Sequence, residues 1–110
     1  MTAIEFERLA REEFAKKFGV PLYKIKRAGF PKEFDLVSED GTIVGDAKFY
    51  SMVAGLRNPP AKWATIAEHV WFLEKVRATL KFLVFGNDRR VPQSWLKRWG
   101  GFVDLFLANY

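Results

Sequence analysis

The chain of 110 residues contains no cysteine and a single histidine, His69. The absence of cysteine excludes disulfide frameworks, thiolate nucleophiles and zinc sites that use cysteine ligands. A lone histidine argues against a histidine-rich metal site or a serine–histidine relay, and its position within a helical segment favours a structural or exposed role. Any catalysis must therefore use carboxylates, lysines or hydroxyls.

The sequence also lacks long apolar runs, internal repeats and low-complexity tracts. Charged residues interrupt every segment that approaches the ~20 apolar residues of a membrane span. Residues 1–8 are acidic and lack the apolar stretch of a signal peptide. With 49% hydrophobic residues the chain can build a packed core, so we expect one soluble, cytoplasmic domain over residues 1–110 with no membrane association.

The chain has a net charge of +5, and its acidic residues are absent from Phe14 to Lys32 and scarce in residues 56–110. Residues 1–55 carry nine basic and nine acidic side chains, whereas residues 56–110 carry nine and four. A basic surface around an acidic centre favours phosphate binding, although a solvated basic face explains the charge equally well. The candidate contacts to a nucleic-acid backbone are Lys24, Lys26, Arg27, Arg89 and Arg90.

Hydrophobic periodicity and turn residues divide the chain into alternating helices and strands. The predicted elements are a helix over Thr2 to Phe18, strands over Leu22 to Arg27, Glu33 to Glu39 and Thr42 to Tyr50, a helix over Ala61 to Leu80, a strand over Lys81 to Phe85, a helix over Pro92 to Trp99 and a strand over Phe102 to Leu107. The order is αβββαβ with an appended C-terminal αβ unit. It predicts an α/β fold whose mixed sheet has helices on both sides.

Asp40-Gly41 is a strong hairpin signal between the second and third predicted strands. If these two residues form the turn, residues whose numbers sum to 81 lie opposite each other. Asp35 then faces Asp46 with Cβ atoms roughly 4.5 to 5.5 Å apart, and strand alternation places Lys48 on the same face.

Two facing aspartates are costly in a strand, because like charges at ~5 Å repel by about 3 kcal/mol at an effective dielectric near 20. A compensating cation is therefore required. Lys48 can supply one positive charge, and paired carboxylates on a rigid scaffold are also the hard oxygen ligands that Mg²⁺ or Mn²⁺ prefers. The alternative is an ordinary surface salt bridge between Asp and Lys, worth ~0 to 1 kcal/mol.

The arrangement resembles the PD-(D/E)XK nuclease superfamily, which includes restriction endonucleases and archaeal-type Holliday junction resolvases. The resemblance rests on Phe34-Asp35-Leu36-Val37 and on Gly41-Thr42-Ile43-Val44-Gly45-Asp46-Ala47-Lys48, within the order of helices and strands given above. It covers roughly residues 3–86. Phe34 stands where the family often has proline, and residues 89–110 match nothing in the family.

The resemblance implies a restriction-endonuclease-like core and Mg²⁺- or Mn²⁺-dependent hydrolysis of DNA phosphodiester bonds. It implies Asp35 and Asp46 as metal ligands, assisted by the Ala47 carbonyl, with Lys48 at the attacking water. The family often adds a catalytic glutamate from the first helix. Glu7 lies near the centre of the apolar stripe of that helix and is the first choice, ahead of Glu13 at the edge of the stripe.

A chain of this size leaves few residues for a base-reading module. Structure-selective cleavage of Holliday junctions or other branched DNA, in recombination or repair, is therefore favoured over a restriction-type endonuclease. Cutting two strands favours a homodimer. Two further hypotheses stay open: a non-catalytic nucleic-acid-binding module on the same fold, with the acids as salt-bridge partners, and a structural domain that uses its surplus Trp and Phe as an interface.

Overall fold

The computed structural model describes residues 1–50, 60–99 and 106–109. Its elements are α1 (Ala3–Phe18), β1 (Leu22–Ile25), β2 (Phe34–Ser38), β3 (Ile43–Tyr50), α2 (Pro60–Glu74), β4 (Leu80–Asn87), α3 (Arg90–Trp99) and β5 (Phe106–Asn109). This αβββαβαβ order is the predicted one. No helix of the described residues is both long enough and apolar enough to cross a membrane.

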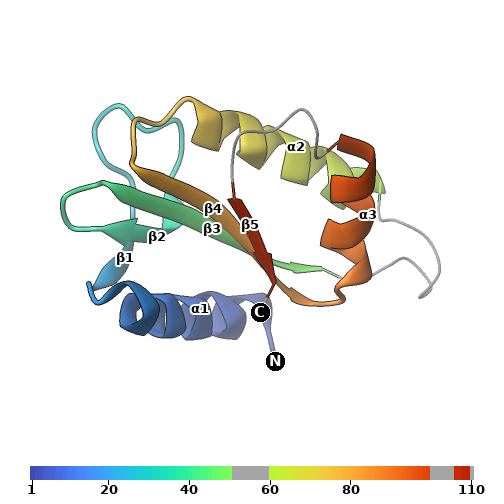
Figure 1. The fold of residues 1–110 in the computed structure, drawn as a ribbon, viewed down its shortest axis with the longest axis horizontal. Coiled ribbons are helices and arrows are strands. Elements are labelled where there is room, and N and C mark those ends of the chain that lie inside the picture. The colour runs from blue at the N-terminus through green and yellow to red at the C-terminus, as the bar shows by residue number, and fades with distance from the viewer. Residues whose placement is uncertain (51–59, 100–105, 110) are drawn as a thin grey trace.

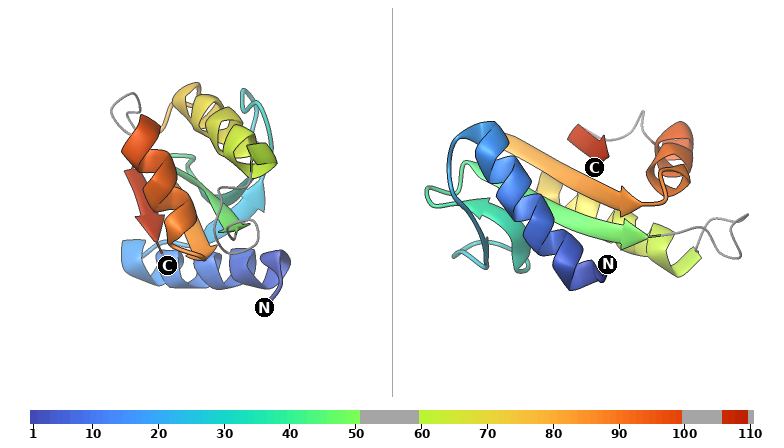
Figure 2. Two further views of the ribbon diagram at one scale, coloured as in Figure 1. Left: turned by 90° about the vertical axis from the view of Figure 1, so that its right-hand side faces the viewer. Right: turned by 90° about the horizontal axis from the view of Figure 1, so that it is seen from below.

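The five strands form one mixed sheet in the order β1-β2-β3-β4-β5 (Figure 1). The first three strands pair antiparallel, whereas β4 runs parallel to β3 and β5 runs parallel to β4. Helix α1 lies on one side of the sheet and helices α2 and α3 lie on the other (Figure 2). The predicted α/β class, with a mixed sheet between helices, is confirmed.

The hairpin between β2 and β3 has the predicted register, since Leu36 pairs with Gly45 and Val37 with Val44. The predicted two-residue turn was wrong, because β2 ends at Ser38 and β3 begins at Ile43, which leaves four residues between the strands. The Gly41 amide donates to the Ser38 carbonyl, and Gly41 has a φ of 74°, a left-handed conformation that glycine adopts without a steric penalty. The Asp40 carboxylate accepts hydrogen bonds from the Thr42 amide and from the hydroxyls of Thr42 and Ser38. These bonds lower the pKa of Asp40 to about 2 and fix the turn that sets the register.

Helix α1 covers one face of the sheet. Thr2 caps its N-terminus in a reciprocal pair of hydrogen bonds with Glu5, and Gly19 ends it with a φ of 72°. Its buried stripe packs on alternate residues of the strands, and this core cluster contains Phe6, Ala10, Phe14, Leu22, Leu36, Ala47, Phe82 and Val84. Ala47 is the residue of β3 in this cluster, so its neighbours Asp46 and Lys48 must face α2.

The second core cluster lies between the sheet and helices α2 and α3. It contains Phe34, Val37, Val44, Ile66, Val70, Leu73, Val76, Leu83, Phe85, Val91 and Trp95. Trp95 of α3 is buried in this cluster. The face of the sheet that this cluster covers also carries Asp46 and Lys48, which have the same parity along β3 as Val44.

Several predicted boundaries were wrong. The second helix ends at Glu74 instead of Leu80, because the amides of Thr79 and Leu80 bond to the Thr42 carbonyl and carry the chain into β4 alongside β3. Pairing within the sheet thus overrides local helical propensity there. Strand β1 stops at Ile25, helix α3 begins at Arg90, and residues 102–105 of the predicted last strand lie outside the described residues.

Candidate functional site

Asp35 of β2 and Asp46 of β3 lie immediately beyond the last ladder pair of the hairpin. Each carboxyl group bonds to the backbone of the other's strand, and the two lie close enough to shift each other's pKa. The Asp35 amide donates to Oδ1 of Asp46 over 3.1 Å, and the Ala47 amide donates to Oδ2 of Asp35 over 3.0 Å. Side-chain oxygens therefore join the two strands here, and the predicted juxtaposition of the two carboxyls is observed.

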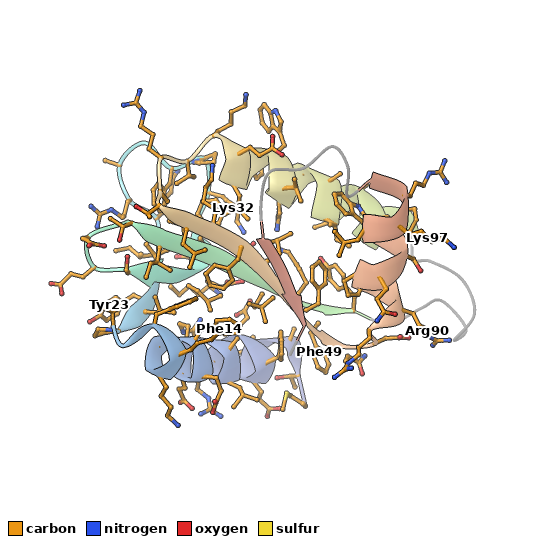
Figure 3. The ribbon with its side chains drawn as sticks, in the orientation of Figure 1. Phe14, Tyr23, Lys32, Phe49, Arg90 and Lys97 are labelled. Carbon is orange, nitrogen blue, oxygen red and sulfur yellow. The ribbon has the colours of Figure 1, made fainter. Side chains whose placement is uncertain are left out.

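Three nitrogen atoms surround Oδ2 of Asp46, a residue with no exposed surface. They are Nζ of Lys32 at 2.6 Å, Nδ1 of His69 at 2.9 Å and Nζ of Lys48 at 3.0 Å. Lys48 and His69 also contact each other. Lys32 reaches this point from the loop between β1 and β2 and lies between the sheet and α2 (Figure 3). A buried carboxylate needs such partners, because desolvation of an unpaired charge is costly.

The sequence reasoning missed Lys32 and His69. His69 was expected in a structural or exposed role, but its side chain is only 14% exposed and contacts the predicted site. A signal for it was available, because His69 follows Ile66 by three residues and precedes Leu73 by four. It therefore shares the sheet-facing side of α2 with two fully buried residues. Lys32 follows a proline in an irregular loop, where no periodicity predicts which way a side chain points.

Glu7 of α1 reaches the same site through Lys24 of β1. Nζ of Lys24 lies 3.2 Å from Oε2 of Glu7 and 3.8 Å from Oδ1 of Asp35. The hydrogen bond to Glu7 raises the pKa of Lys24. Glu13 instead forms an exposed ion pair with Lys16 at 3.8 Å, so its side chain is engaged elsewhere. Of the two glutamates considered, Glu7 is the one beside the carboxyl pair.

The two aspartates have opposite shifts in pKa. Burial, together with the hydrogen bond to Asp46 and the charge of Asp46, raises the pKa of Asp35 to about 8. Burial also acts to raise the pKa of Asp46, but hydrogen bonds from His69 and Asp35 and the charge of Lys48 outweigh it and hold that pKa well below its usual range. Near neutral pH the pair therefore shares one proton, held on Asp35, and carries one negative charge.

Burial lowers the pKa of the Lys48 amine, and the charge of Asp46 opposes this effect only in part. Lys48 is 7% exposed, so its amine has little contact with water. Tyr50, two residues further along β3 on the same face, is half-buried, and burial raises its pKa to about 12. The site thus combines an ionised carboxylate, a protonated carboxyl and an amine that gives up its proton more readily than an exposed lysine.

The donor chemistry of this site fits a hard divalent cation. Mg²⁺ is commonly held by one or two carboxylates with water in its other positions, and Asp35 and Asp46 supply two carboxylates in contact. Within the described residues, no cluster of three or more His, Asp or Glu side chains is arranged to hold a metal ion. The nitrogens around Asp46 neutralise the site in the absence of a metal, so a cation would have to compete with them.

The five basic residues proposed as backbone contacts are not gathered in one place. Lys24 alone among them contacts the carboxyl pair. Arg27 donates to the Glu39 carbonyl at the hairpin end of the sheet, whereas Arg90 pairs with Asp88 over 2.7 Å beyond the other end of β4 (Figure 3). Lys26 and Arg89 are exposed.

Comparisons with protein-family models, with curated proteins and with solved structures found no match to this chain.

Proposed function

We propose that this chain is a metal-dependent endonuclease with a restriction-endonuclease-like core, which hydrolyses DNA phosphodiester bonds. The observation that carries the proposal is the juxtaposition of Asp35 and Asp46 on adjacent strands, where each carboxyl bonds to the backbone of the other's strand, with the buried Lys48 amine 3.0 Å from Asp46. Two carboxylates and an amine on one rigid sheet are the groups that metal-assisted hydrolysis requires. The αβββαβ order and the parallel pairing of β3 with β4 support the proposed core.

Asp35 and Asp46 would hold Mg²⁺ or Mn²⁺, with the Ala47 carbonyl as a further oxygen donor. When bound, the ion supplies a Lewis acid that stabilises negative charge on phosphoryl oxygens. Asp35 gives up its proton on binding, because a carboxyl must ionise to act as a ligand. Lys48 orients the attacking water and accepts a proton at Nζ, since burial lowers the pKa of that amine.

Side chains beside the carboxyl pair also support a DNA substrate. Glu7 holds Lys24 beside Asp35, where the amine can meet a phosphate that enters the site. We favour branched DNA or Holliday junctions over a defined restriction sequence, because 110 residues leave little room for a base-reading module. A homodimer would present two such sites to two strands.

A cleavage assay tests this proposal directly. Linear duplex, flap and four-way junction substrates are incubated with Mg²⁺ and either the wild-type protein or the Asp46→Ala variant. We expect wild-type cleavage, greatest on the branched substrates, and loss of both cleavage and calorimetric Mn²⁺ binding in the variant. Equal cleavage by the two proteins would show that another group, or a contaminant, performs the reaction.

A second candidate function is a non-catalytic nucleic-acid-binding module. It is favoured by the three nitrogens at Asp46, which neutralise the carboxylate without any metal ion. This candidate predicts salt-dependent DNA binding with no cleavage in Mg²⁺ or Mn²⁺ and no calorimetric metal binding. The same set of measurements therefore separates the two functions.

A further inference from the structure

A cavity of about 420 Å³ lies at the hairpin end of the sheet, away from the carboxyl pair. Its walls are Arg27 to Phe30 from the loop between β1 and β2, Lys75 to Arg77 after α2, and Asp40 and Gly41 of the hairpin turn. The loop between β1 and β2 and the segment that follows α2 lie side by side at the left of Figure 1. The cavity is thus built from three segments that are distant in the sequence.

The charged groups around this cavity are mainly basic. Arg27, Lys75 and Arg77 line it, and in the described parts of the chain no acidic side chain forms an ion pair with Lys75 or Arg77. Arg27 lies over Gly41, and one of its guanidinium N–H groups donates a hydrogen bond to the Glu39 carbonyl, which leaves further donors on a group that has five.

Asp40 is the acidic residue of the cavity wall. Its Oδ1 already accepts three hydrogen bonds, from Thr42 and Ser38 within the turn. The cavity therefore presents three cationic groups against one carboxylate that is engaged with its own turn. Such a balance suits an anion with several oxygens, and a phosphate group of a nucleic-acid backbone is one.

An exposed tryptophan adjoins the basic cavity. Trp71 is 55% exposed although it is among the largest apolar side chains of α2, and Nζ of Lys75 lies 5.4 Å from the centre of its ring. Lys75 therefore lies between the cavity and a half-exposed aromatic ring, one face of which its amine covers. A flat aromatic ring beside cationic groups is the arrangement with which proteins stack single-stranded bases while holding the adjoining phosphates.

Two segments connect this surface to the carboxyl pair. The loop between β1 and β2 carries Arg27 at the cavity and Lys32 at Asp46. Helix α2 carries His69 at Asp46, and Lys75 follows six residues later, about 9 Å along a helical rise.

We propose that the cavity formed by Arg27, Lys75 and Arg77, together with Trp71, binds a single-stranded arm of nucleic acid. The basic side chains hold the phosphates and Trp71 stacks on an unpaired base. The inference deepens the proposed function, on which it rests for the identity of the substrate, because it gives the unpaired segment of branched DNA a place to bind.

Fluorescence anisotropy tests the proposal in EDTA, where no cleavage occurs. The probes are a labelled oligothymidine of about 15 nucleotides and a blunt duplex of equal length, each titrated over a range of NaCl concentrations. We expect Trp71→Leu to weaken oligothymidine binding by about 5-fold to 150-fold, with a smaller effect on the duplex and partial recovery in Trp71→Phe, which keeps an aromatic face. Tyr23→Leu, at an aromatic residue 47% exposed on β1, should leave both affinities unchanged.

The basic residues are tested through the salt dependence of binding. A double variant, Lys75→Ala with Arg77→Ala, should reduce the slope of log K against log[NaCl] for oligothymidine by about 1.4, since each phosphate contact contributes ~0.7. Lys16→Ala with Arg8→Ala removes two exposed charges from α1 and should leave the slope unchanged. Thermal unfolding verifies that every variant is folded.

Wild-type affinity and an unchanged slope in the cavity variants would overturn this inference, and so would a wild-type protein that binds no oligothymidine. The outcome is separate from that of the cleavage assay. If the cavity variants bind normally while cleavage still depends on Asp46, the inference fails and the proposed nuclease stands. If the protein binds single strands through Trp71 but cleaves nothing, the inference stands and the proposed nuclease activity fails.

Discussion

The free energy of unfolding of the metal-free protein should depend on pH through Asp35, and Asp35→Asn should remove that dependence. Asp35 has a pKa of about 8 in the folded protein, because of burial and the neighbouring Asp46, and about 3.9 in an unfolded chain. Because the pKa of Asp35 is raised in the folded protein, the protonated Asp35 carboxyl makes its full contribution to stability below about pH 3.9. It decreases as the pH rises and is lost above about pH 8.

The magnitude follows from proton linkage. Between about pH 6 and pH 8 the folded protein retains a proton that the unfolded chain has released, and each pH unit removes about 1.4 kcal/mol of stability. The expected loss is roughly 2 to 3 kcal/mol, a large part of the 5 to 15 kcal/mol that is typical of a domain. Asparagine cannot ionise, yet its oxygen can accept from the Ala47 amide and its NH₂ group can donate to Asp46, as the protonated carboxyl does.

Urea unfolding in EDTA, followed by tryptophan fluorescence at pH values from 6 to 9, measures this effect. The stability of Asp35→Asn relative to the wild type should grow by roughly 2 to 3 kcal/mol, in favour of the variant, between pH 6 and pH 9. Glu13→Gln, which removes an exposed carboxylate from α1, should follow the wild-type curve. Parallel curves for Asp35→Asn and the wild type would falsify the claim that the carboxyl pair shares one proton.

Further predictions concern the site and the scaffold. Lys48→Ala should bind Mn²⁺ and DNA within a few-fold of wild type but cleave ~10²- to 10⁴-fold more slowly, and full cleavage would remove this amine from the mechanism. Below pH 8, calorimetric Mn²⁺ affinity should rise about tenfold per pH unit, because binding releases the Asp35 proton, and a flat profile would contradict that coupling. Gly45→Ala would place a Cβ 2.6 Å from the Phe82 ring and should destabilise the fold by roughly 1 to 3 kcal/mol in urea unfolding, whereas an unchanged midpoint would show that the ring can move. Thr2→Ala should lose about 1 kcal/mol with the helix cap, measured in the same way, and no loss would mean that the end of the helix is frayed.

Much of the fold could be predicted because its signals are local. The order of helices and strands follows from hydrophobic spacing and from Gly and Pro, and it was confirmed. The end of the second helix was not predictable in this way. Residues 75–80 have no strong helix breaker, and only pairing of the chain with β3 determines where the helix stops.

The candidate site, like the fold, could be predicted from the sequence only in part. The facing of Asp35 and Asp46 depends on one turn and on the alternation of side chains, so counting along the sequence predicts it. Lys32 and His69 come from a loop and from a helix whose positions over the sheet are set by packing. The nucleic-acid contacts proposed from charge alone were dispersed by the fold, because neighbours in sequence need not share a surface.

The amino-acid sequence by itself determined the element order and the hairpin register. It therefore also determined that Asp35 and Asp46 lie side by side on adjacent strands and that Asp46 shares its face of the sheet with Lys48, since short-range backbone geometry fixes these features. Only the tertiary structure decided how the pair is neutralised and which basic residues meet around a cavity. Those contacts join segments 14 to 50 residues apart, and they exist only once α2 and the loop between β1 and β2 have packed at their places on the sheet.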